Sequence, residues 1–559
     1  MRNSSILPLL TIAALVVGCT GADDRSTGGP ADAGGTLVIA VGGDADVFFP
    51  ALTMTASGRA LTDVVFDRLA EIGPELNTVG DKGFEPRLAK SWTWAPDSLS
   101  IAFQLDARAR WHDGRPVRAG DVKFSFDLAR DPSVGSASAP LIGNIDSVTV
   151  RDSLTAVAWY HRRTPEQFYD LTYQIWVVPE HVYGPIPRAE LKTSDILRRP
   201  VGSGRFRFVR WEPGVRFEVT ADTANYRGRA KLDRVIWTIT PDPTAGPARV
   251  LAGDADFWEN LLPDHLSRFA ADSDVRVQPY PGLQFAAMYM NFRDRRGARP
   301  HPIFGDAAVR RALSMAVDRR AMLRNVFDTV GKLAYGPFAQ SQSIADTTLR
   351  LPLHDVARAK TLLDSAGWRV TPSGYREKQG RSLEFTLLVP SSSRARMAYT
   401  VLLQSQLREV GAKVNVEQVD FPTFFSRQNA KDFDAAMISV SGDPSPSGAR
   451  QFWHSASATK DGANYVWYAN PRFDVLIDSA IASFDPAATK RYASRAFQVL
   501  VDDAPAIWLY EPLTLAGVHR RVRTPGMRAD GYWAGLPEWN IPASERIARD
   551  RIGLAAASP

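Results

Sequence analysis

The chain has 559 residues, of which 45% are hydrophobic and 23% are charged, values typical of packed globular proteins. This composition excludes a disordered chain, a collagen-like chain and a coiled coil, and the single cysteine excludes a disulfide framework or a cysteine-based metal cage. The formal net charge is +6, but the basic residues are scattered and closely matched by acidic ones, so we expect no nucleic-acid partner.

The N-terminus has the pattern of an export signal. Arg2 precedes a mostly apolar run over residues 6–17, which is too short to cross a hydrocarbon core of about 30 Å. Val16–Cys19 resembles the lipobox of bacterial lipoproteins and contains the only cysteine, although an ordinary signal peptide with a chance cysteine is the alternative. We predict a signal peptide over 1–18, a lipid on Cys19, a flexible tether over 19–35, and an exported protein held on a membrane.

Beyond the tether, predicted strands and helices alternate along the chain. Residues 35–41 are rich in β-branched side chains and predict a strand, and residues 59–71 carry apolar side chains at helical spacing. Further strands are expected at 98–105, 205–210, 216–221, 235–240, 383–389, 413–419 and 506–510. Further helices are expected at 122–130, 244–253, 307–325, 355–366, 399–410, 473–484 and 490–502. The order of helix, glycine and strand, as around Gly411, indicates the α/β class.

A series of short sequence motifs occurs along the chain in the same order as in one known family. They include Arg87–Trp92, Trp111–Val117, Asp121–Phe126, Pro200–Phe206, Tyr289–Phe292, Leu362–Trp368, Leu407–Gly411, Asp432–Asp434, Tyr468–Pro471 and Asp503–Pro505. Together they cover roughly residues 36–512, and they resemble the bacterial extracellular solute-binding proteins of family 5. These are the binding components of ABC importers for oligopeptides, dipeptides and nickel.

The resemblance implies a two-lobed α/β clamp of the type II periplasmic-binding-protein kind with an extra subdomain. Lobe I is then expected to contain residues 36–72, 198–283 and 508–559, the last range including a C-terminal tail. The extra subdomain is expected over 73–197 and lobe II over 284–507. Ligand bound between the lobes favours the closed state of such a clamp.

The resemblance also implies a monomeric binding subunit that captures peptides and delivers them to permease subunits, without cofactor, metal or catalysis. Nickel chelates, haem or oligosaccharides remain alternative ligands, and a sensory or chaperone-like lipoprotein is an alternative role. A hydrolase is disfavoured because the sequence has neither a G-x-S-x-G elbow nor an H-E-x-x-H helix. Ser457–Lys460 matches S-x-x-K, but the companion motifs of penicillin-recognising enzymes are missing.

Peptide binders of this family hold the α-amino group of the peptide with an aspartate at the end of a lobe II strand. The resemblance places Asp443 at that position, after Ser441 and Gly442, although Asp443 alternatively only opens a Pro-Ser-Pro loop. Pro444–Ser447 departs from the family, where a second acidic residue is frequent. The matching lobe I stretch contains Thr53 and Thr55. Two tryptophans either line side-chain pockets or pack in the core, namely Trp453 and Trp467.

Overall fold

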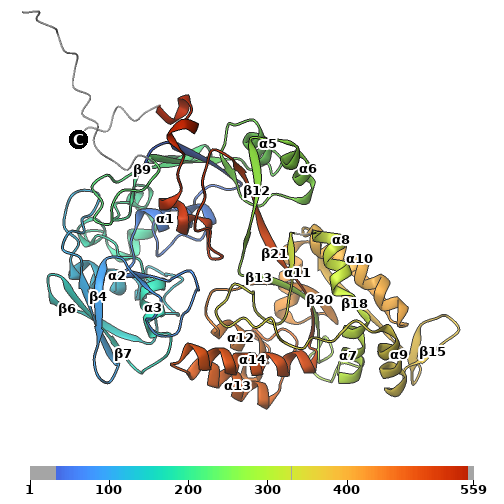
Figure 1. The fold of residues 1–559 in the computed structure, drawn as a ribbon. Helices are drawn as coiled ribbons and strands as arrows, with labels where there is room; N and C mark the ends of the chain where they lie inside the picture. Colours follow the sequence, from blue (N-terminus) through green and yellow to red (C-terminus); the bar gives the residue numbers. More distant parts are fainter. Residues whose placement is uncertain (1–32, 329, 552–559) are drawn as a thin grey trace, which may run out of the picture.

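A 12-stranded mixed sheet runs through two lobes, and a separate four-stranded sheet lies beside it (Figure 1). The computed structural model describes residues 33–328 and 330–551. Helices cover both faces of the lobe II part of the large sheet, and the described chain mixes parallel and antiparallel strand pairs. The predicted α/β class is confirmed.

Lobe I is built around a short parallel core. Its strands are β1 (Thr36–Val41), β8 (Phe206–Glu212), β9 (Arg216–Ala221), β10 (Arg234–Ile239) and β11 (Phe257–Trp258). Strand β1 lies between β10 and β11 and is parallel to both. Helix α1 (Ala56–Val65) begins where the Thr55 hydroxyl accepts the N–H of Gly58, and its Leu61 packs in the same core as Ile39 of β1. Helix α5 (Ala245–Leu251) packs against β1 and β11.

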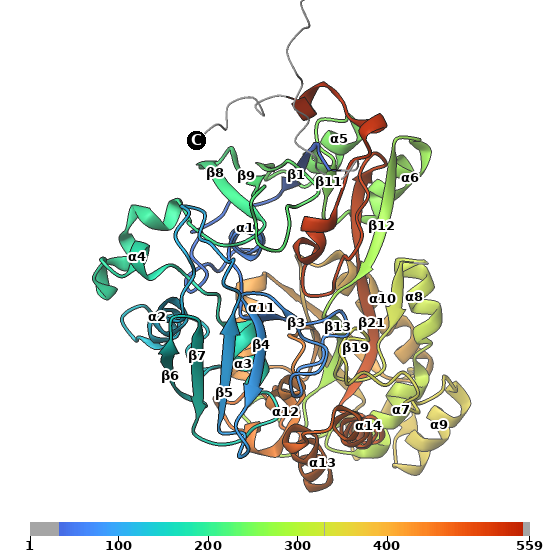
Figure 2. The ribbon, with the colours of Figure 1, turned by 60° about the vertical axis from the view of Figure 1, so that its left-hand side comes forward.

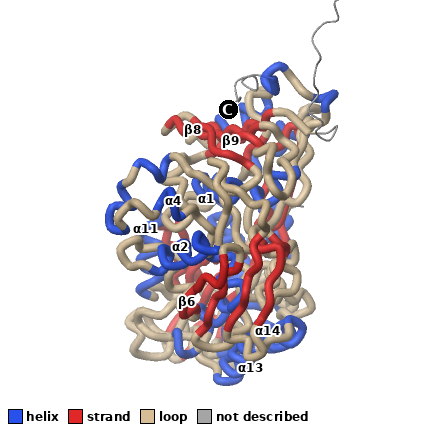
Figure 3. The backbone as a smooth tube through the Cα atoms, turned by 90° about the vertical axis from the view of Figure 1, so that its left-hand side faces the viewer, coloured by secondary structure: helices blue, strands red, loops and turns tan. Residues whose placement is uncertain are grey.

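The extra subdomain has its own sheet and its own core. The antiparallel sheet contains β4 (Ala89–Trp94), β5 (Ser100–Leu105), β7 (Thr155–Tyr160) and β6 (Ile145–Asp152). Helix α2 (Ala119–Arg130) packs on β6 and β7, and helix α3 (Gln167–Gln174) follows the sheet. Phe103, Phe126 and Phe168 belong to one hydrophobic cluster of this subdomain. In Figure 3 the sheet lies below strands β8 and β9 of lobe I.

Lobe II is a sheet with helices on both faces. Its strands are β13 (Gln284–Met290), β14 (Gly331–Leu333), β18 (Glu384–Pro390), β19 (Lys413–Val419) and β20 (Ala435–Ser441). Its main helices are α7 (Ala307–Ala316), α8 (Arg319–Phe327), α9 (Val356–Ser365), α10 (Arg394–Glu409), α13 (Pro471–Ala482) and α14 (Pro486–Asp503). Alternate residues of β20 enter different clusters: Ile438 packs with α13 and α14, whereas Met437 packs with α7 and α10.

Two strand passages connect the lobes. The first joins β12 (Val275–Pro281) to β13 through Gly282 and Leu283. The second is β21 (Ala506–His519), which pairs with β13 and β14 up to Pro512 and with β12 from Leu513 onward. Strand β21 therefore runs unbroken through both lobes, as Figure 2 shows, and its change of partner falls beyond the expected 507/508 boundary.

Two helix expectations are wrong in their bounds. The expected helix over 307–325 is two helices, α7 and α8, because Val317 is extended and the Asp318 carboxylate caps α8 by accepting the N–H of Ala321. The expected helix over 59–71 runs from Ala56 to Val65 instead. It ends there because Phe66 is extended and the Val65 carbonyl accepts the N–H of Gly204.

The predicted signal peptide, the predicted lipidation site Cys19 and most of the predicted tether lie outside the described residues. Among residues 33–328 and 330–551, no helix has both the length and the apolar character that crossing a membrane requires.

Candidate ligand-binding site

The lobe II candidates Ser441, Gly442 and Asp443 lie where strand β20 ends, directly beside the first passage between the lobes. The Gly442 N–H donates to the Leu283 carbonyl over 2.8 Å, which fixes the end of β20 against the passage. The Gln342 side-chain amide donates to the Asp443 carbonyl over 2.8 Å, and the Asp443 carboxylate accepts the N–H of Ser445 over 2.8 Å. The predicted residues are therefore held at the junction of the lobes.

The Asp443 carboxylate has no positively charged partner within the part of the chain that the structure describes. Its side chain is exposed to solvent, but nearby protein atoms remove part of its hydration. This partial loss of hydration raises the pKa of Asp443 above its usual range, and the hydrogen bond from Ser445 opposes the shift. An uncompensated carboxylate at this position suits a cationic group of a ligand.

Two more carboxylates face this position from the extra subdomain. Glu166, next to the first residue of α3, accepts hydrogen bonds from the Ser445 hydroxyl over 2.8 Å and from the Thr78 hydroxyl over 2.5 Å. Burial raises the pKa of Glu166 to about 7, and the negative charge of Asp443 adds to the shift. Burial, together with Glu166 and Asp443, raises the pKa of Asp170 to about 8.

Neither Glu166 nor Asp170 forms an ion pair with any described residue, so three carboxylates meet here without a cation. The sequence analysis missed this pair. Helix α3 carries no motif, and only the folded chain brings it beside the loop that follows β20, so no local signal in the sequence identifies it.

Lobe I contains a cavity of about 420 Å³ at the carboxyl ends of β1 and β11. Ligands of open α/β sheets bind at such strand ends. Thr55 at the start of α1 lines this cavity, as the sequence analysis expected of a ligand-binding residue, whereas Thr53 does not. The remaining lining consists of Ile39–Asp44, Ala56, Ser57, Trp258–Asn260, Tyr532 and Trp533. We call this cavity the lobe I pocket.

The hydroxyls of Thr53 and Thr55 are used within their own loop. Both donate to Asp46 Oδ1, over 2.8 and 2.9 Å, and the Met54 N–H donates to Asp46 Oδ2 over 2.7 Å. These bonds fix the loop in shape and leave the Met54 side chain 77% exposed. A ligand would therefore meet the backbone of this loop and Met54 rather than free threonine hydroxyls.

The two tryptophans occupy different surroundings. Trp453 is 1% exposed, stacks on Tyr289 and meets Trp508 edge-on, so the structure favours the core-packing alternative for it. Trp467 is half-buried beside Gly297 and Lys431. Lys431 lies near the start of β20 and Asp443 beyond its end, and the seven residues of this strand span about 20 Å. The structure therefore does not bring Trp467 to the carboxylates.

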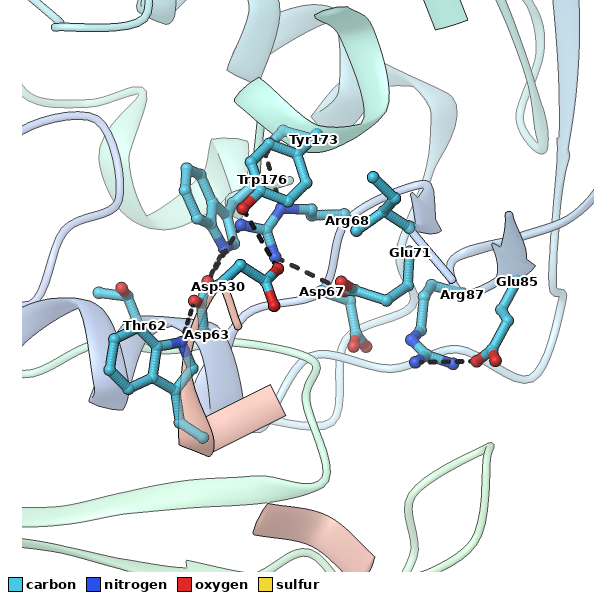
Figure 4. Close-up of polar contacts among 12 residues, drawn as sticks. Thr62, Asp63, Asp67, Arg68, Glu71, Glu85, Arg87, Tyr173, Trp176 and Asp530 are labelled. Atoms are coloured by element: carbon cyan, nitrogen blue, oxygen red, sulfur yellow. Dashed lines mark hydrogen bonds and ion pairs between the residues drawn. The ribbon is translucent and has the colours of Figure 1, made fainter. Parts of the chain in front are cut away.

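A second polar cavity, about 60 Å³, lies where lobe I, the extra subdomain and the C-terminal segment meet. Arg68 at its centre is buried, pairs with Asp63 at 3.1 Å and with Glu71 at 3.6 Å, and lies over the ring of Trp176 (Figure 4). Asp530 of the C-terminal segment accepts a hydrogen bond from Tyr173 over 3.3 Å. Each carboxylate that lines this cavity pairs with an arginine of the lining, which indicates a structural joint between the three parts of the chain.

No group of three or more His, Cys, Asp or Glu side chains within residues 33–328 and 330–551 has the arrangement of a metal site. Two lobes joined by two strand passages, with unpaired carboxylates at their junction, define a clamp that binds a solute. The model of the bacterial extracellular solute-binding proteins, family 5 (middle part), matches residues 83–462, so this chain belongs to that family. The predicted resemblance is confirmed.

Individual relatives cover nearly the whole chain. The oligopeptide-binding protein AppA of Bacillus subtilis is 24% identical over 515 residues, 90% of this chain and 92% of its own length. Protein XP55 of Streptomyces lividans is 28% identical over 492 residues, 87% of this chain and 86% of its own.

Solved structures show the same fold. That of Bacillus subtilis AppA with a nonapeptide has a TM-score of 0.69 at 23% identity, covering 91% of this chain and 99% of AppA. The structure of Campylobacter jejuni NikZ with Ni(L-His) has a TM-score of 0.71 at 23% identity, and the match covers 90% of this chain and 99% of NikZ. The expected two-lobed clamp is confirmed by these likenesses.

Proposed function

We propose that this protein is the extracytoplasmic binding subunit of an ABC importer, and that it captures peptides between its lobes and delivers them to a permease. It acts as a monomer that binds without catalysis, held on a membrane by a lipid on Cys19. Its membership in a family of extracellular solute-binding proteins supports the extracytoplasmic role. The name of its relative AppA, an oligopeptide-binding protein, supports the choice of peptides.

The single observation that carries the peptide assignment is the unpaired carboxylate of Asp443 at the junction of the lobes. A peptide's α-ammonium group loses hydration when it enters such a site and needs an anionic partner. Asp443 supplies that partner, and Glu166, with a pKa of about 7, adds part of a negative charge close to it, whereas Asp170, with a pKa of about 8, is mostly protonated at neutral pH. A neutral or anionic ligand would leave the carboxylate of Asp443 uncompensated.

The two strand passages supply the mechanism of capture. Ligand groups that contact both the lobe I pocket and the end of β20 stabilise the state in which these surfaces approach each other. The passages at Gly282–Leu283 and at Pro512 are the segments that must bend, because the sheet pairing changes from one lobe to the other there. The ligand is released when the permease favours the open state.

Native mass spectrometry of the purified protein, followed by calorimetric titration, tests this function. We expect a co-purified peptide, and binding of synthetic peptides of three to nine residues without turnover. Small-angle scattering should show compaction on saturation. Ni(L-His) is the control ligand. Binding of Ni(L-His) but of no peptide, or product formation in proportion to protein concentration, would contradict the proposal.

A further inference from the structure

We propose that the lobe I pocket binds a basic side chain of the ligand, so that the preferred peptides carry Lys or Arg in addition to their cationic amino end. This inference rests on the proposed peptide-binding function and deepens it, because it assigns a specificity to a second part of the site.

The pocket contains a carboxylate without a cationic partner among the described residues, that of Glu259. It lines the pocket, is partly buried, and has one hydrogen bond, which the Tyr280 hydroxyl donates. No Lys, Arg or His of the described chain forms an ion pair with it. Burial raises the pKa of Glu259. A partly buried carboxylate without a cation destabilises the protein, and a ligand cation in the pocket would remove that penalty.

Aromatic side chains form walls of the lobe I pocket. Trp258, Tyr532 and Trp533 line the same cavity as Glu259. Helix α5 holds the Trp258 ring in place, since a Cβ at Gly246 would lie 2.1 Å from its Cε3 atom, and the indole N–H is buried without a partner. Aromatic faces beside a carboxylate attract ammonium and guanidinium groups and also pack against their methylene stems.

The floor of the pocket is open. It is formed by Gly42 and Gly43 at the end of β1, and a Cβ at Gly43 would meet no atom within 4 Å. The space of about 420 Å³ is therefore not filled by this chain's own side chains. A long, thin side chain fits between the glycine floor and the tryptophan rings.

The charged residues that line the pocket are acidic. Asp44 is a second carboxylate of the pocket, and its partners are neutral: Trp211 Nε1 at 3.0 Å, the Gly214 N–H at 2.7 Å and the Ala45 N–H at 2.7 Å. No lysine or arginine lines the pocket, although 67 of the 559 residues are Lys or Arg. In contrast, the cavity around Arg68 contains both signs of charge in pairs. The lobe I pocket therefore keeps an uncompensated negative potential.

The pocket lies close enough to Asp443 for one short peptide to reach both. Tyr280, which bonds Glu259, is three residues from Leu283, a span of at most about 11 Å, and the Leu283 carbonyl bonds the N–H of Gly442. An extended peptide covers about 3.3 Å per residue. A ligand of a few residues can place its amino end at Asp443 and a basic side chain at Glu259.

Calorimetric titration of alanine tetrapeptides tests the inference. Arginine is placed at position 2, 3 or 4, and each peptide is compared with its citrulline analogue, which has nearly the same shape without the charge. Wild-type protein should bind the arginine form at least tenfold more tightly at one position. In Glu259→Gln that preference should fall below threefold, and the circular dichroism spectrum and Tm of the variant show that it is folded. The exposed Glu409→Gln serves as the matched control and should keep the wild-type preference.

The outcomes separate this inference from the proposed function. If tetrapeptides bind but arginine and citrulline differ by less than threefold at every position, the basic-side-chain pocket is wrong and peptide capture stands. The same conclusion follows if Glu259→Gln retains the full preference. If the wild-type protein binds none of these peptides, peptide capture itself is overturned.

Discussion

One serine links two carboxylates that belong to different parts of the molecule: Ser445 donates its backbone N–H to Asp443 and its hydroxyl to Glu166, each over 2.8 Å. The loop after β20 is thereby tied to the extra subdomain as well as to the passage between the lobes. A cation that neutralises Asp443 also lowers the repulsion that Glu166 experiences. Recognition at the lobe II strand end is therefore electrostatically coupled to the extra subdomain.

The first prediction concerns Asp443 as the anchor of the peptide's amino end. Asp443→Ala should weaken binding of a free-amine peptide at least tenfold, or about 1.4 kcal/mol. The loss should be smaller than the roughly 3–5 kcal/mol of a fully buried pair, because Asp443 keeps contact with solvent. N-acetylation of the peptide should weaken its binding to the wild type for the same reason. Calorimetric titration measures both effects.

The control for this prediction is Asp461→Asn, an exposed aspartate near Lys431 at the other end of the lobe II sheet. It should bind the free-amine peptide as the wild type does. If acetylation and Asp443→Ala each change the dissociation constant by less than threefold, Asp443 does not anchor an amine.

The second prediction concerns pH. The pKa of Glu166 is raised to about 7 and that of Asp170 to about 8, both above the values of the unfolded chain. Ionising these two carboxyls therefore costs more free energy in the folded chain than in the unfolded chain. Below about pH 4 both are protonated and this cost is absent, and the free energy of unfolding decreases as the pH rises towards 8. Asp170→Asn should raise Tm relative to the wild type at pH 8 and have a clearly smaller effect at pH 5. Thermal unfolding of the ligand-free protein at both pH values measures this difference.

Glu75→Gln, an exposed carboxylate of the same subdomain, is the matched control and should leave Tm unchanged at both pH values. An equal effect of Asp170→Asn on Tm at pH 5 and pH 8 would show that ionisation of Asp170 does not cause the pH dependence of Tm. Affinity for a free-amine peptide should rise between about pH 6 and 8, because deprotonation of Glu166 and Asp170 adds negative charge near the peptide's ammonium group.

The predictions from sequence succeed where a local pattern determines the structure. Strand β19 over 413–419 has the expected bounds, and strand β1 begins one residue later than expected, at Thr36, because β-branched residues mark both strands. Strand β20 ends at Ser441, shortly before Asp443, as the resemblance to the family implies. The α7–α8 break was missed because a single capping side chain, Asp318, interrupts an otherwise continuous helical pattern.

The candidate site was only partly predictable for a different reason. Glu166, Asp170 and Glu259 carry no motif, and their importance comes from partners far away in the sequence, such as Ser445 for Glu166. Whether a carboxylate is paired or unpaired depends on every element packed around it. Trp453 shows the same limit, because its position in the core results from contacts with Tyr289 and Trp508 on separate strands.

The third prediction concerns the proposed membrane anchor. Cys19→Ser removes the thiol that would carry the lipid, so the protein should leave the membrane fraction or keep its signal peptide. Fractionation of cells and the intact mass of the purified protein measure this. A mutant with the wild-type mass and the wild-type membrane association would contradict lipidation of Cys19.

The last prediction concerns the joint between lobe I and the extra subdomain. Arg68 is 5% exposed and makes ion pairs with Asp63 and Glu71, so Arg68→Ala leaves Asp63 without a cation among the described residues, while Glu71 keeps only its pair with Arg528. It also removes the guanidinium group that lies 3.9 Å from the centre of the Trp176 ring. Breaking a buried ion pair in this way costs about 3–5 kcal/mol, and urea unfolding should show that loss. Arg108→Ala is the control, because its pair with Asp106 lies at the surface and should not change the urea midpoint detectably. Equal midpoints for Arg68→Ala and Arg108→Ala would mean that the Arg68 pairs do not stabilise this joint.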